Sequence, residues 1–177
     1  MVKNDFVIFD RDGTLIDHIP YLNKVESIRF KSDLIPSLQS LQSYGFKFGI
    51  ISNQSAISRG LATIDDVLRI NSAINDYLRK NEIEVEFSWF CPHAPSEYCN
   101  CRKPRIGLGM KAKSEFAIRA HKSYVVGDSE SDIVFGRDLG CKTVYINGGS
   151  ANVGENYSTN QLSLAADWII RDYTNGI

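Results

Sequence analysis

Short apolar runs alternate with amphipathic stretches along this chain. The runs of strand length are 6–9, 46–51, 87–90, 123–126 and 143–146. Between them lie stretches whose apolar residues recur three or four positions apart, at 32–43, 63–79, 108–120 and 132–139. That spacing is typical of a helix with one buried face. The alternation predicts an α/β fold, with a doubly wound, mainly parallel sheet covered by helices on both faces.

The C-terminal part of the chain has a weaker pattern. Residues 148–159 are polar and predict a loop, 162–166 predict a short helix, and the apolar run 168–170 indicates a last strand. No internal repeat and no linker composition divides the chain, so we expect a single domain over 1–177. Only one helix fits between the first two strands, which predicts that no large cap domain is inserted there.

Composition narrows the class of protein. The chain has 177 residues, of which 43% are hydrophobic and 23% charged, and this is typical of a globular domain. Its net charge of −1 gives no basic field for nucleic acid or an anionic membrane. The N-terminus lacks the apolar stretch of a signal peptide and no segment is long enough to span a bilayer, so we expect a cytoplasmic protein. In that compartment cysteines are metal ligands or buried thiols before they are disulfides.

Three polar clusters directly follow predicted strands. The first strand runs into Asp10-Arg11-Asp12-Gly13-Thr14, the second into Ser52-Asn53-Gln54, and the fourth into Gly127-Asp128-Ser129. Each cluster alone could be a turn or a helix cap, because Asp, Ser and Gly are common there. In a parallel sheet, however, the carboxyl ends of the strands meet at one edge, where ligands bind. The sequence therefore predicts that the three clusters form one site.

The residue types in these clusters suit phosphoryl transfer. Asp10 can attack phosphorus as a carboxylate nucleophile, and Asp12 can protonate the leaving alcohol and then deprotonate water. Asp128 adds a third carboxylate for a hard cation such as Mg²⁺. Ser52 can donate its hydroxyl to a phosphoryl oxygen, and Lys103 can neutralise charge on the transferring group.

A second cluster combines three cysteines and a histidine. The set is Cys91, His93, Cys99 and Cys101, which is the composition of a closed structural Zn²⁺ site. The loop between these residues has little apolar content, so a metal is the plausible organiser of its structure. The alternative is three unrelated cysteines. We interpret Cys141 as a core thiol, and His18 and His121 as surface or packing residues.

Together these residues resemble the haloacid dehalogenase superfamily of phosphatases. Its four motifs stand here, in the expected order, as Asp10-x-Asp12-Gly13-Thr14, Ser52, Lys103 and Gly127-Asp128-Ser129-x-x-Asp132. The resemblance implies that Mg²⁺ is held by Asp10, Asp128 and the main-chain carbonyl of Asp12. It leaves open whether Asp132 touches the metal or only supports the site.

The motif Cys-x-His-x₅-Cys-x-Cys followed by Arg102-Lys103-Pro104 narrows the resemblance to one branch. This zinc-loop branch (residues 91–104) holds D-glycero-D-manno-heptose 1,7-bisphosphate phosphatases and histidinol-phosphate phosphatases. The segment 53–60 is similar to the heptose enzymes, with Ala56 in place of their usual Gly, whereas the five-residue gap is as typical of the histidinol branch.

The same resemblance implies a set of substrate contacts. They are Arg11, Asp17, Tyr21, Asn53, Gln54, Ser55, Arg59, Arg102 and Ser129. Ile19-Pro20 departs from the Gly-Tyr that is usual in the stretch 17–21.

Three functions follow as hypotheses. The first is removal of the 7-phosphate of a heptose 1,7-bisphosphate in bacterial surface-sugar synthesis, by a monomer that acts on a small phosphorylated substrate. The second is hydrolysis of histidinol phosphate. The third is a zinc-stabilised binding module without catalytic activity, although such a module would not need Asp10, Asp12, Asp128 and Lys103 together.

Overall fold

One parallel sheet organises the part of the chain that the structure describes. The structure is a computed structural model that describes residues 4–149 and 152–176. Within these ranges six strands pair in the order β3-β2-β1-β4-β5-β6, and each neighbouring pair is parallel. The strands are β1 (Phe6–Phe9), β2 (Lys47–Asn53), β3 (Val85–Cys91), β4 (Tyr124–Gly127), β5 (Lys142–Ile146) and β6 (Tyr157–Thr159). The predicted α/β class is confirmed.

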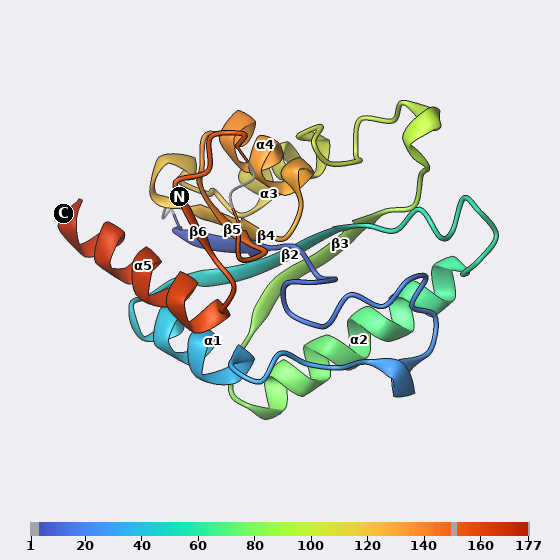
Figure 1. Ribbon diagram of the computed structural model, residues 1–177, viewed down its shortest axis with the longest axis horizontal. Coiled ribbons are helices and arrows are strands. Elements are labelled where there is room, and N and C mark those ends of the chain that lie inside the picture. The colour runs from blue at the N-terminus through green and yellow to red at the C-terminus, as the bar shows by residue number, and fades with distance from the viewer. Residues whose placement is uncertain (1–3, 150–151, 177) are drawn as a thin grey trace.

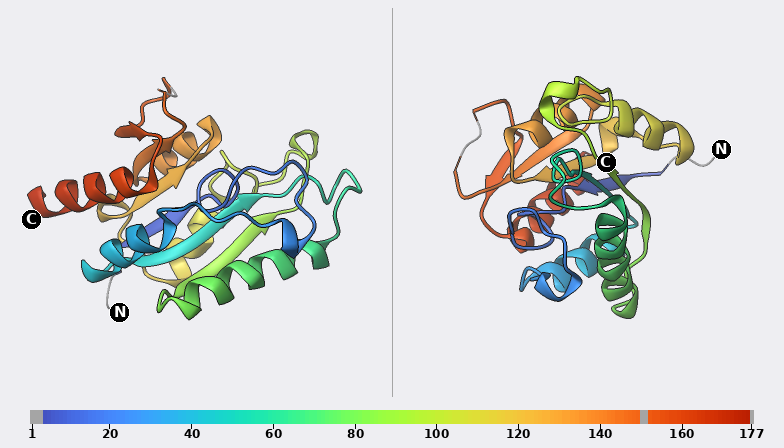
Figure 2. Two further views of the ribbon diagram at one scale, coloured as in Figure 1. Left: turned by 60° about the horizontal axis from the view of Figure 1, so that its bottom comes forward. Right: turned by 90° about the vertical axis from the view of Figure 1, so that its right-hand side faces the viewer.

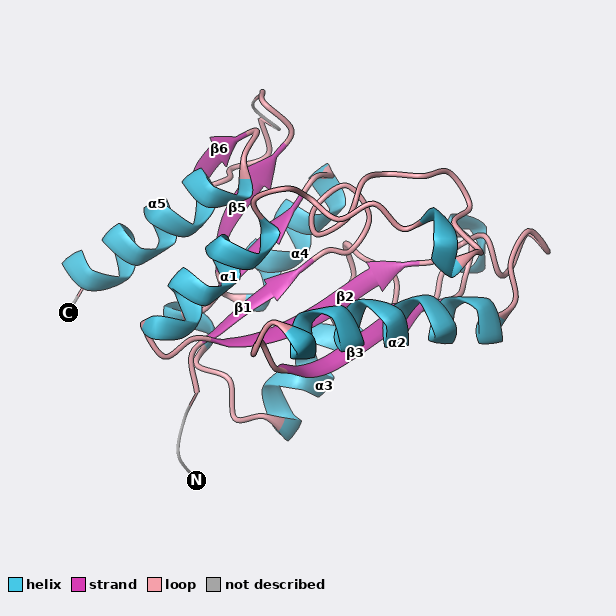
Figure 3. Ribbon diagram, turned by 90° about the horizontal axis from the view of Figure 1, so that it is seen from below, coloured by secondary structure: helices cyan, strands magenta, loops and turns pink. Residues whose placement is uncertain are grey.

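Helices cover both faces of this sheet. On one face lie α1 (Leu34–Ser43), α2 (Ile64–Lys80) and α5 (Leu162–Asn175), and on the other α3 (Gly107–Glu115) and α4 (Glu130–Leu139) (Figures 1 and 3). Short 3₁₀ turns span Val25–Ser27, Pro95–Glu97 and Ala120–Lys122. Among the described residues no helix is long and apolar enough to cross a membrane.

The fully apolar β1 explains why both faces of the sheet are covered. Its side chains alternate, so Val7 and Phe9 pack into the core cluster under α1, α2 and α5, whereas Phe6 and Ile8 pack into the cluster under α3 and α4. All four are buried. A strand with two apolar faces must lie inside a sheet that is covered on both sides, which is where β1 lies.

Two predictions near the C-terminus are wrong. Residues 157–159 form strand β6, which pairs with β5, and residues 168–170 belong to α5 and not to a strand. The apolar residues of α5 that are buried, Leu162, Ala165, Ala166 and Ile169, follow the helical spacing, and α5 packs beside α1. A three-residue strand is too short to show a period of two, and it is set by pairing with β5.

The helix predicted for 108–120 ends early. The last residue of α3 is Glu115, and Ala117 takes a left-handed conformation with φ of 52°. The next residues leave the helix because the main chain of 117–119 pairs with Asn4: Asn4 N–H donates to Ala117, and Arg119 N–H donates to Asn4. A partner 113 residues away in the chain thus ends this helix.

The strand order reverses direction at β1. From β1 the chain moves to β2 and β3 on one side of the sheet, then returns to β4, β5 and β6 on the other. The loops that follow β1, β2 and β3 gather at one end of the sheet (Figure 2, left). The carboxyl ends of β1 and β4 therefore flank a topological switch point, the usual position of a ligand site in such sheets.

Candidate active site

The first two carboxylates stand at the ends of neighbouring strands. Asp10 follows β1 directly, and its main-chain N–H donates to Val126 O in β4 at 2.8 Å. Asp128 follows β4. The turn after Asp10 needs Gly13, which has a φ of +87°, and a Cβ at that position would stand 1.9 Å from Asp128 Oδ2. Gly13 thus allows the loop after β1 to approach the end of β4.

A third carboxylate completes an acidic cluster. Oxygen atoms of Asp10, Asp128 and Asp132 all lie within 4.8 Å of one another. Burial, together with the neighbouring charge of Asp132, raises the pKa of Asp128 to about 6. Burial also holds the pKa of Asp10 above its ordinary value, against the opposing effect of Lys103. Such a set of carboxylate oxygens fits a hard divalent cation.

Lys103 lies between two of these carboxylates. Its Nζ is 2.6 Å from Asp10 Oδ1 and 2.7 Å from Asp132 Oδ1, and it also donates to Ile51 O at 2.5 Å. Although burial opposes it, the two carboxylates raise the pKa of Lys103 above its ordinary value. The ammonium group is therefore charged and held beside the Asp10 carboxylate.

Asp132 has two separate uses. Its Oδ2 accepts hydrogen bonds from Ser129 N at 3.0 Å and Ser129 Oγ at 2.6 Å, which forms the capping box at the start of α4. Its Oδ1 faces Lys103. This arrangement favours a supporting role for Asp132, with Lys103 as its partner.

Asp12 is held by side chains on two sides. Arg11 donates from Nε to Asp12 Oδ2 at 3.0 Å and from Nη2 to Oδ1 at 3.1 Å. Gln54 donates from Nε2 to Asp12 Oδ2 at 2.8 Å and to Ser52 Oγ at 3.1 Å. The turn after β1 and the carboxyl end of β2 are therefore joined into one network at the sheet edge, as the sequence predicted for these two clusters.

Asn53 fixes the backbone of Lys103. The Asn53 amide donates from Nδ2 to Lys103 O at 3.0 Å, and its Oδ1 accepts from Lys103 N at 3.0 Å. These paired hydrogen bonds tie the end of β2 to the segment after the cysteines. They orient the Lys103 side chain toward Asp10.

A cavity of about 260 Å³ opens beside Asp12. Its lining includes five of the side chains that the sequence assigned to substrate, namely Arg11, Tyr21, Asn53, Gln54 and Ser55. It also includes His18, Ile19, Pro20, Leu22 and Ala56. Arg59 does not line the cavity but lies at its rim, with Nη1 3.5 Å from the Tyr21 hydroxyl.

The other predicted substrate contacts lie outside the lining of this cavity. Asp17 is exposed and pairs with Lys31 at 2.9 Å. Arg102 donates from Nη1 to His93 O at 3.1 Å, and Ser129 serves the α4 cap.

Two side chains of this region were not found from the sequence. His18, interpreted as a surface or packing residue, is indeed exposed, and it also lines the cavity. Its place between Asp17 and Tyr21, in the stretch that the resemblance relates to substrate, was the available signal. Asn71 on α2 accepts a hydrogen bond from Arg11 at 3.0 Å. The sequence feature that could have identified Asn71 is a polar residue within the apolar stripe of that helix.

The four cysteine and histidine side chains of the zinc loop form a compact cluster. His93 Nδ1 lies 3.2 Å from Cys101 Sγ, and Cys91 Sγ lies 3.2 Å from Cys101 Sγ and 3.5 Å from Cys99 Sγ. A tetrahedral Zn²⁺ site with Zn–S bonds of about 2.3 Å places its ligand atoms somewhat under ~4 Å apart. The donor set and its compactness therefore fit Zn²⁺.

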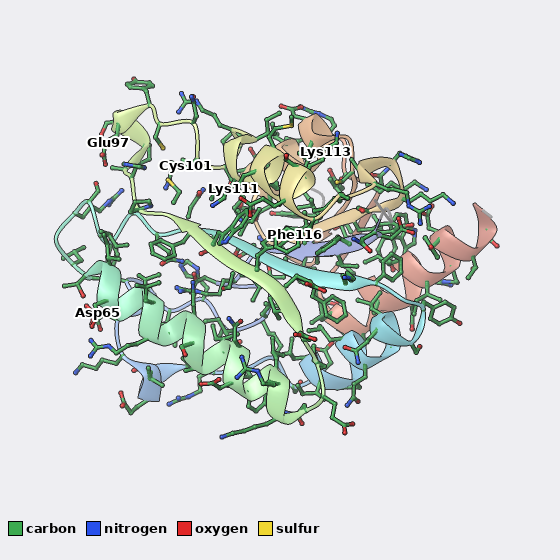
Figure 4. The ribbon with its side chains drawn as sticks, turned by 180° about the vertical axis from the view of Figure 1, so that it is seen from behind. Asp65, Glu97, Cys101, Lys111, Lys113 and Phe116 are labelled. Carbon is green, nitrogen blue, oxygen red and sulfur yellow. The ribbon has the colours of Figure 1, made fainter. Side chains whose placement is uncertain are left out.

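The thiols of this cluster differ in acidity. Burial raises the pKa of Cys91 to about 12. Burial acts in the same direction on Cys99, but hydrogen bonds from Cys101 and Cys91 outweigh it and lower the pKa of Cys99 to about 7. Cys101 and Glu97 lie on the loop that rises beyond the end of β3 (Figure 4).

The fold and these contacts define a class of protein. A doubly wound parallel sheet carries a buried carboxylate directly after β1, a second acid two residues further on, and a carboxylate cluster of which two members contact one lysine. This combination defines a doubly wound α/β protein whose site suits metal-assisted phosphoryl transfer.

Comparisons with known proteins agree with that class. A model of the family described as HAD-hydrolase-like matches residues 100–175. A probable D-glycero-D-manno-heptose-1,7-bisphosphate 7-phosphatase of Thermoplasma acidophilum is 36% identical over 135 residues, which are 76% of this chain and 84% of the relative. The histidine biosynthesis bifunctional protein HisB of Campylobacter jejuni is 32% identical over 144 residues, which cover 80% of this chain and 41% of that protein.

A solved structure shows the same fold. The D,D-heptose 1,7-bisphosphate phosphatase of B. bronchiseptica superposes with a TM-score of 0.85, covering 95% of this chain and 99% of the other, at 20% identity. The chain belongs to the haloacid dehalogenase-like phosphatases.

Proposed function

We propose that this chain hydrolyses a phosphomonoester through a covalent intermediate on Asp10. The Asp10 carboxylate attacks phosphorus while the bond to the substrate oxygen breaks, and protonated Asp12 gives its proton to that leaving oxygen. Asp12 then takes a proton from water, whose oxygen attacks the phosphoryl group and restores the Asp10 carboxylate. The contact that carries this proposal is the 2.6 Å ion pair of Lys103 with Asp10, which puts a cation where phosphoryl charge develops.

The metals in this proposal follow from the donor sets. Asp10, Asp128 and the main-chain carbonyl of Asp12 would hold Mg²⁺, which when bound supplies positive charge for the phosphoryl oxygens. The B. bronchiseptica neighbour is described with magnesium and phosphate. Cys91, His93, Cys99 and Cys101 would hold a structural Zn²⁺.

The substrate that we propose is D-glycero-D-manno-heptose 1,7-bisphosphate, with loss of its 7-phosphate. The observation that favours it is the 36% identity with the Thermoplasma acidophilum relative, which carries that activity in its name. The segment after Ser52 supports it, because Gln54, Ser55 and Ala56 of that segment line the cavity beside Asp12. We infer one phosphatase domain that acts as a cytoplasmic monomer on this small sugar phosphate.

Histidinol phosphate is the second candidate substrate. It is favoured by the 32% identity with the Campylobacter jejuni protein and by the five-residue gap in the zinc loop. A purely binding role has no support from the Thermoplasma acidophilum relative, which is named as a phosphatase.

Phosphate release from the two substrates tests this assignment. Purified protein with Mg²⁺ would be assayed on both anomers of the heptose bisphosphate and on histidinol phosphate, with the product identified by ³¹P NMR. We expect kcat/KM at least about tenfold higher for one heptose anomer than for histidinol phosphate, and a product that keeps its 1-phosphate. The reverse preference would replace the proposed substrate by the second candidate. Absence of release from all three would refute both.

A further inference from the structure

Arg11 is buried beside the proposed proton donor. Its side chain is 1% exposed and is the largest fully buried side chain among the described residues. A guanidinium removed from water needs hydrogen-bond acceptors in the protein. Although the resemblance relates Arg11 to substrate, three of its donor atoms already have acceptors within the protein.

Those acceptors come from two different elements. Nε and Nη2 of Arg11 face the two carboxylate oxygens of Asp12 at 3.0 and 3.1 Å, and Nη1 donates to Asn71 Oδ1 at 3.0 Å. Because a guanidinium is planar and rigid, fixing Nη1 also fixes the orientation of the fork that holds Asp12. The carboxylate of Asp12 is thereby connected to helix α2.

Asn71 occupies an unusual place on that helix. It is 4% exposed and stands among the buried residues Val67, Ile70 and Ile74 of α2. Its Nδ2 has no hydrogen-bond partner among the described residues. Burying an unpaired amide donor costs free energy, so an asparagine here is more easily explained if its oxygen has a function.

We propose that Asn71 is a positioning residue, whose carbonyl oxygen orients Arg11 so that Arg11 holds the Asp12 carboxylate toward the leaving oxygen of the substrate. Gln54 holds the same carboxylate from the other side at 2.8 Å. The inference rests on the proposed role of Asp12 as proton donor. It gives α2, which carries none of the catalytic residues, a part in the chemical step.

Substrates whose leaving groups differ in acidity can test whether Asn71 positions Asp12. An alkoxide must be protonated as it departs, whereas p-nitrophenolate is stable without a proton, so only the first reaction depends on a well-placed Asp12. The constant kcat/KM reports the steps up to the first irreversible one, which includes departure of this group. A positional defect in Asp12 therefore lowers kcat/KM for an alkyl phosphate more than for an aryl phosphate. A general loss of folded structure would lower both equally.

The test compares three variants on β-glycerophosphate and p-nitrophenyl phosphate. Asn71→Leu keeps the branched shape of the side chain, although its methyl groups are bulkier, and removes the acceptor. We expect kcat/KM to fall about tenfold or more on the alkyl ester but less than about threefold on the aryl ester. Asn71→Asp keeps an oxygen acceptor at this position, so its ratio of the two kcat/KM values should equal that of the wild-type protein. Asn75→Leu makes the same change one turn further along α2 and should leave the ratio unchanged.

Asp12→Asn serves as the reference. If it lowers both constants equally, the proposed proton donor is wrong and the inference falls with it. If Asp12→Asn lowers kcat/KM more for the alkyl ester than for the aryl ester and Asn71→Leu does not, only the inference about Asn71 is overturned. The inference is also overturned if Asn75→Leu changes the ratio of the two constants as much as Asn71→Leu does. Circular dichroism and thermal melting confirm that each variant is folded. Should Asn71→Leu fail to fold, Asn71→Ala carries the same expectation.

Discussion

The acidic cluster and the zinc loop are both candidate metal sites, but they are held in place by different means. The carboxylates of Asp10 and Asp128 stand at the ends of β1 and β4, and the hydrogen bonds of the sheet determine their separation. In the zinc loop only Cys91 ends a strand, and the other three donors follow in a segment with one short 3₁₀ turn. The sheet thus builds the first site, whereas the second lies on a loop that a bound ion would help to hold.

Lys103 makes the first site depend on the second. It lies two residues after Cys101, yet its Nζ reaches Asp10 and Asp132. Its backbone N–H and C=O are both hydrogen-bonded to Asn53, and it follows the cysteine cluster closely in the chain. The acidic site at the sheet edge therefore receives one of its charges from the segment that follows the cysteine cluster.

The largest effect is expected from Asp10→Asn. The amide has the same shape but cannot attack phosphorus, and it removes a negative metal ligand, so turnover should fall at least about a hundredfold while the fold persists. Phosphate release measures the turnover, and circular dichroism measures whether the variant is folded. Asp138→Asn, an exposed change on α4, is the matched control and should leave turnover unchanged. Residual turnover above about a hundredth of wild type would argue against Asp10 as the nucleophile.

Cys99→Ser should disturb the zinc loop first and the acidic site second. We expect loss of one bound zinc per chain and a fall in Tm of about 10 °C, because the loop has little apolar packing of its own. Turnover should fall about tenfold, since Lys103 loses its support. Elemental analysis, melting and phosphate release measure the three effects, with Cys141→Ser keeping its zinc as control. An unchanged zinc content would remove Cys99 from the ligand set.

Arg102→Ala should act mainly on substrate affinity. Its guanidinium can bind a second anionic or hydroxyl-rich part of the substrate, so KM should rise about fivefold for a sugar bisphosphate and less for p-nitrophenyl phosphate. Arg102 also donates to His93 O, whereas Arg105 donates to Cys99 O in the same loop. Arg105→Ala is therefore the matched control for loop support, and it should change both KM values alike. If Arg102→Ala changed KM equally for the sugar bisphosphate and for p-nitrophenyl phosphate, Arg102 would only support the loop and would not bind the substrate.

The smallest effect is a shift of stability with pH in metal-free protein. The pKa of Asp128 is raised from 3.8 to about 6, so between these values the folded state binds more protons than the unfolded state. The stability of the folded state is then greatest below about pH 4 with respect to this group, and it decreases as pH rises to about 6. We expect Tm to fall by a few degrees between about pH 4 and pH 6. Added Mg²⁺ should raise Tm more at pH 7 than at pH 5.

Asp128→Asn checks that prediction. The amide does not titrate, so the part of the slope that Asp128 causes should disappear, and the Mg²⁺ effect should weaken. A slope that is unchanged in Asp128→Asn would assign the pH dependence to other buried groups, of which Asp10 is the nearest in character.

Features encoded over short stretches of sequence were predictable. The apolar run before Asp10 predicted the buried strand β1, and the helical spacing of the apolar residues in 63–79 predicted α2. The cysteine cluster was found because its four donors lie within eleven consecutive positions, 91–101. The acidic cluster was found because parallel strands bring their carboxyl ends to one edge.

The amino-acid sequence by itself determined the alternation of elements, the donor sets and the order of the motifs, because local periodicity and short spacing encode these. Only the tertiary structure decided which distant side chains meet. The burial of Arg11 against Asn71, the contact of Lys103 with Asp132, and the pairing of β6 with β5 each join residues from separate elements. Such contacts depend on how helices and strands pack across the sheet, and no spacing along the chain records that packing.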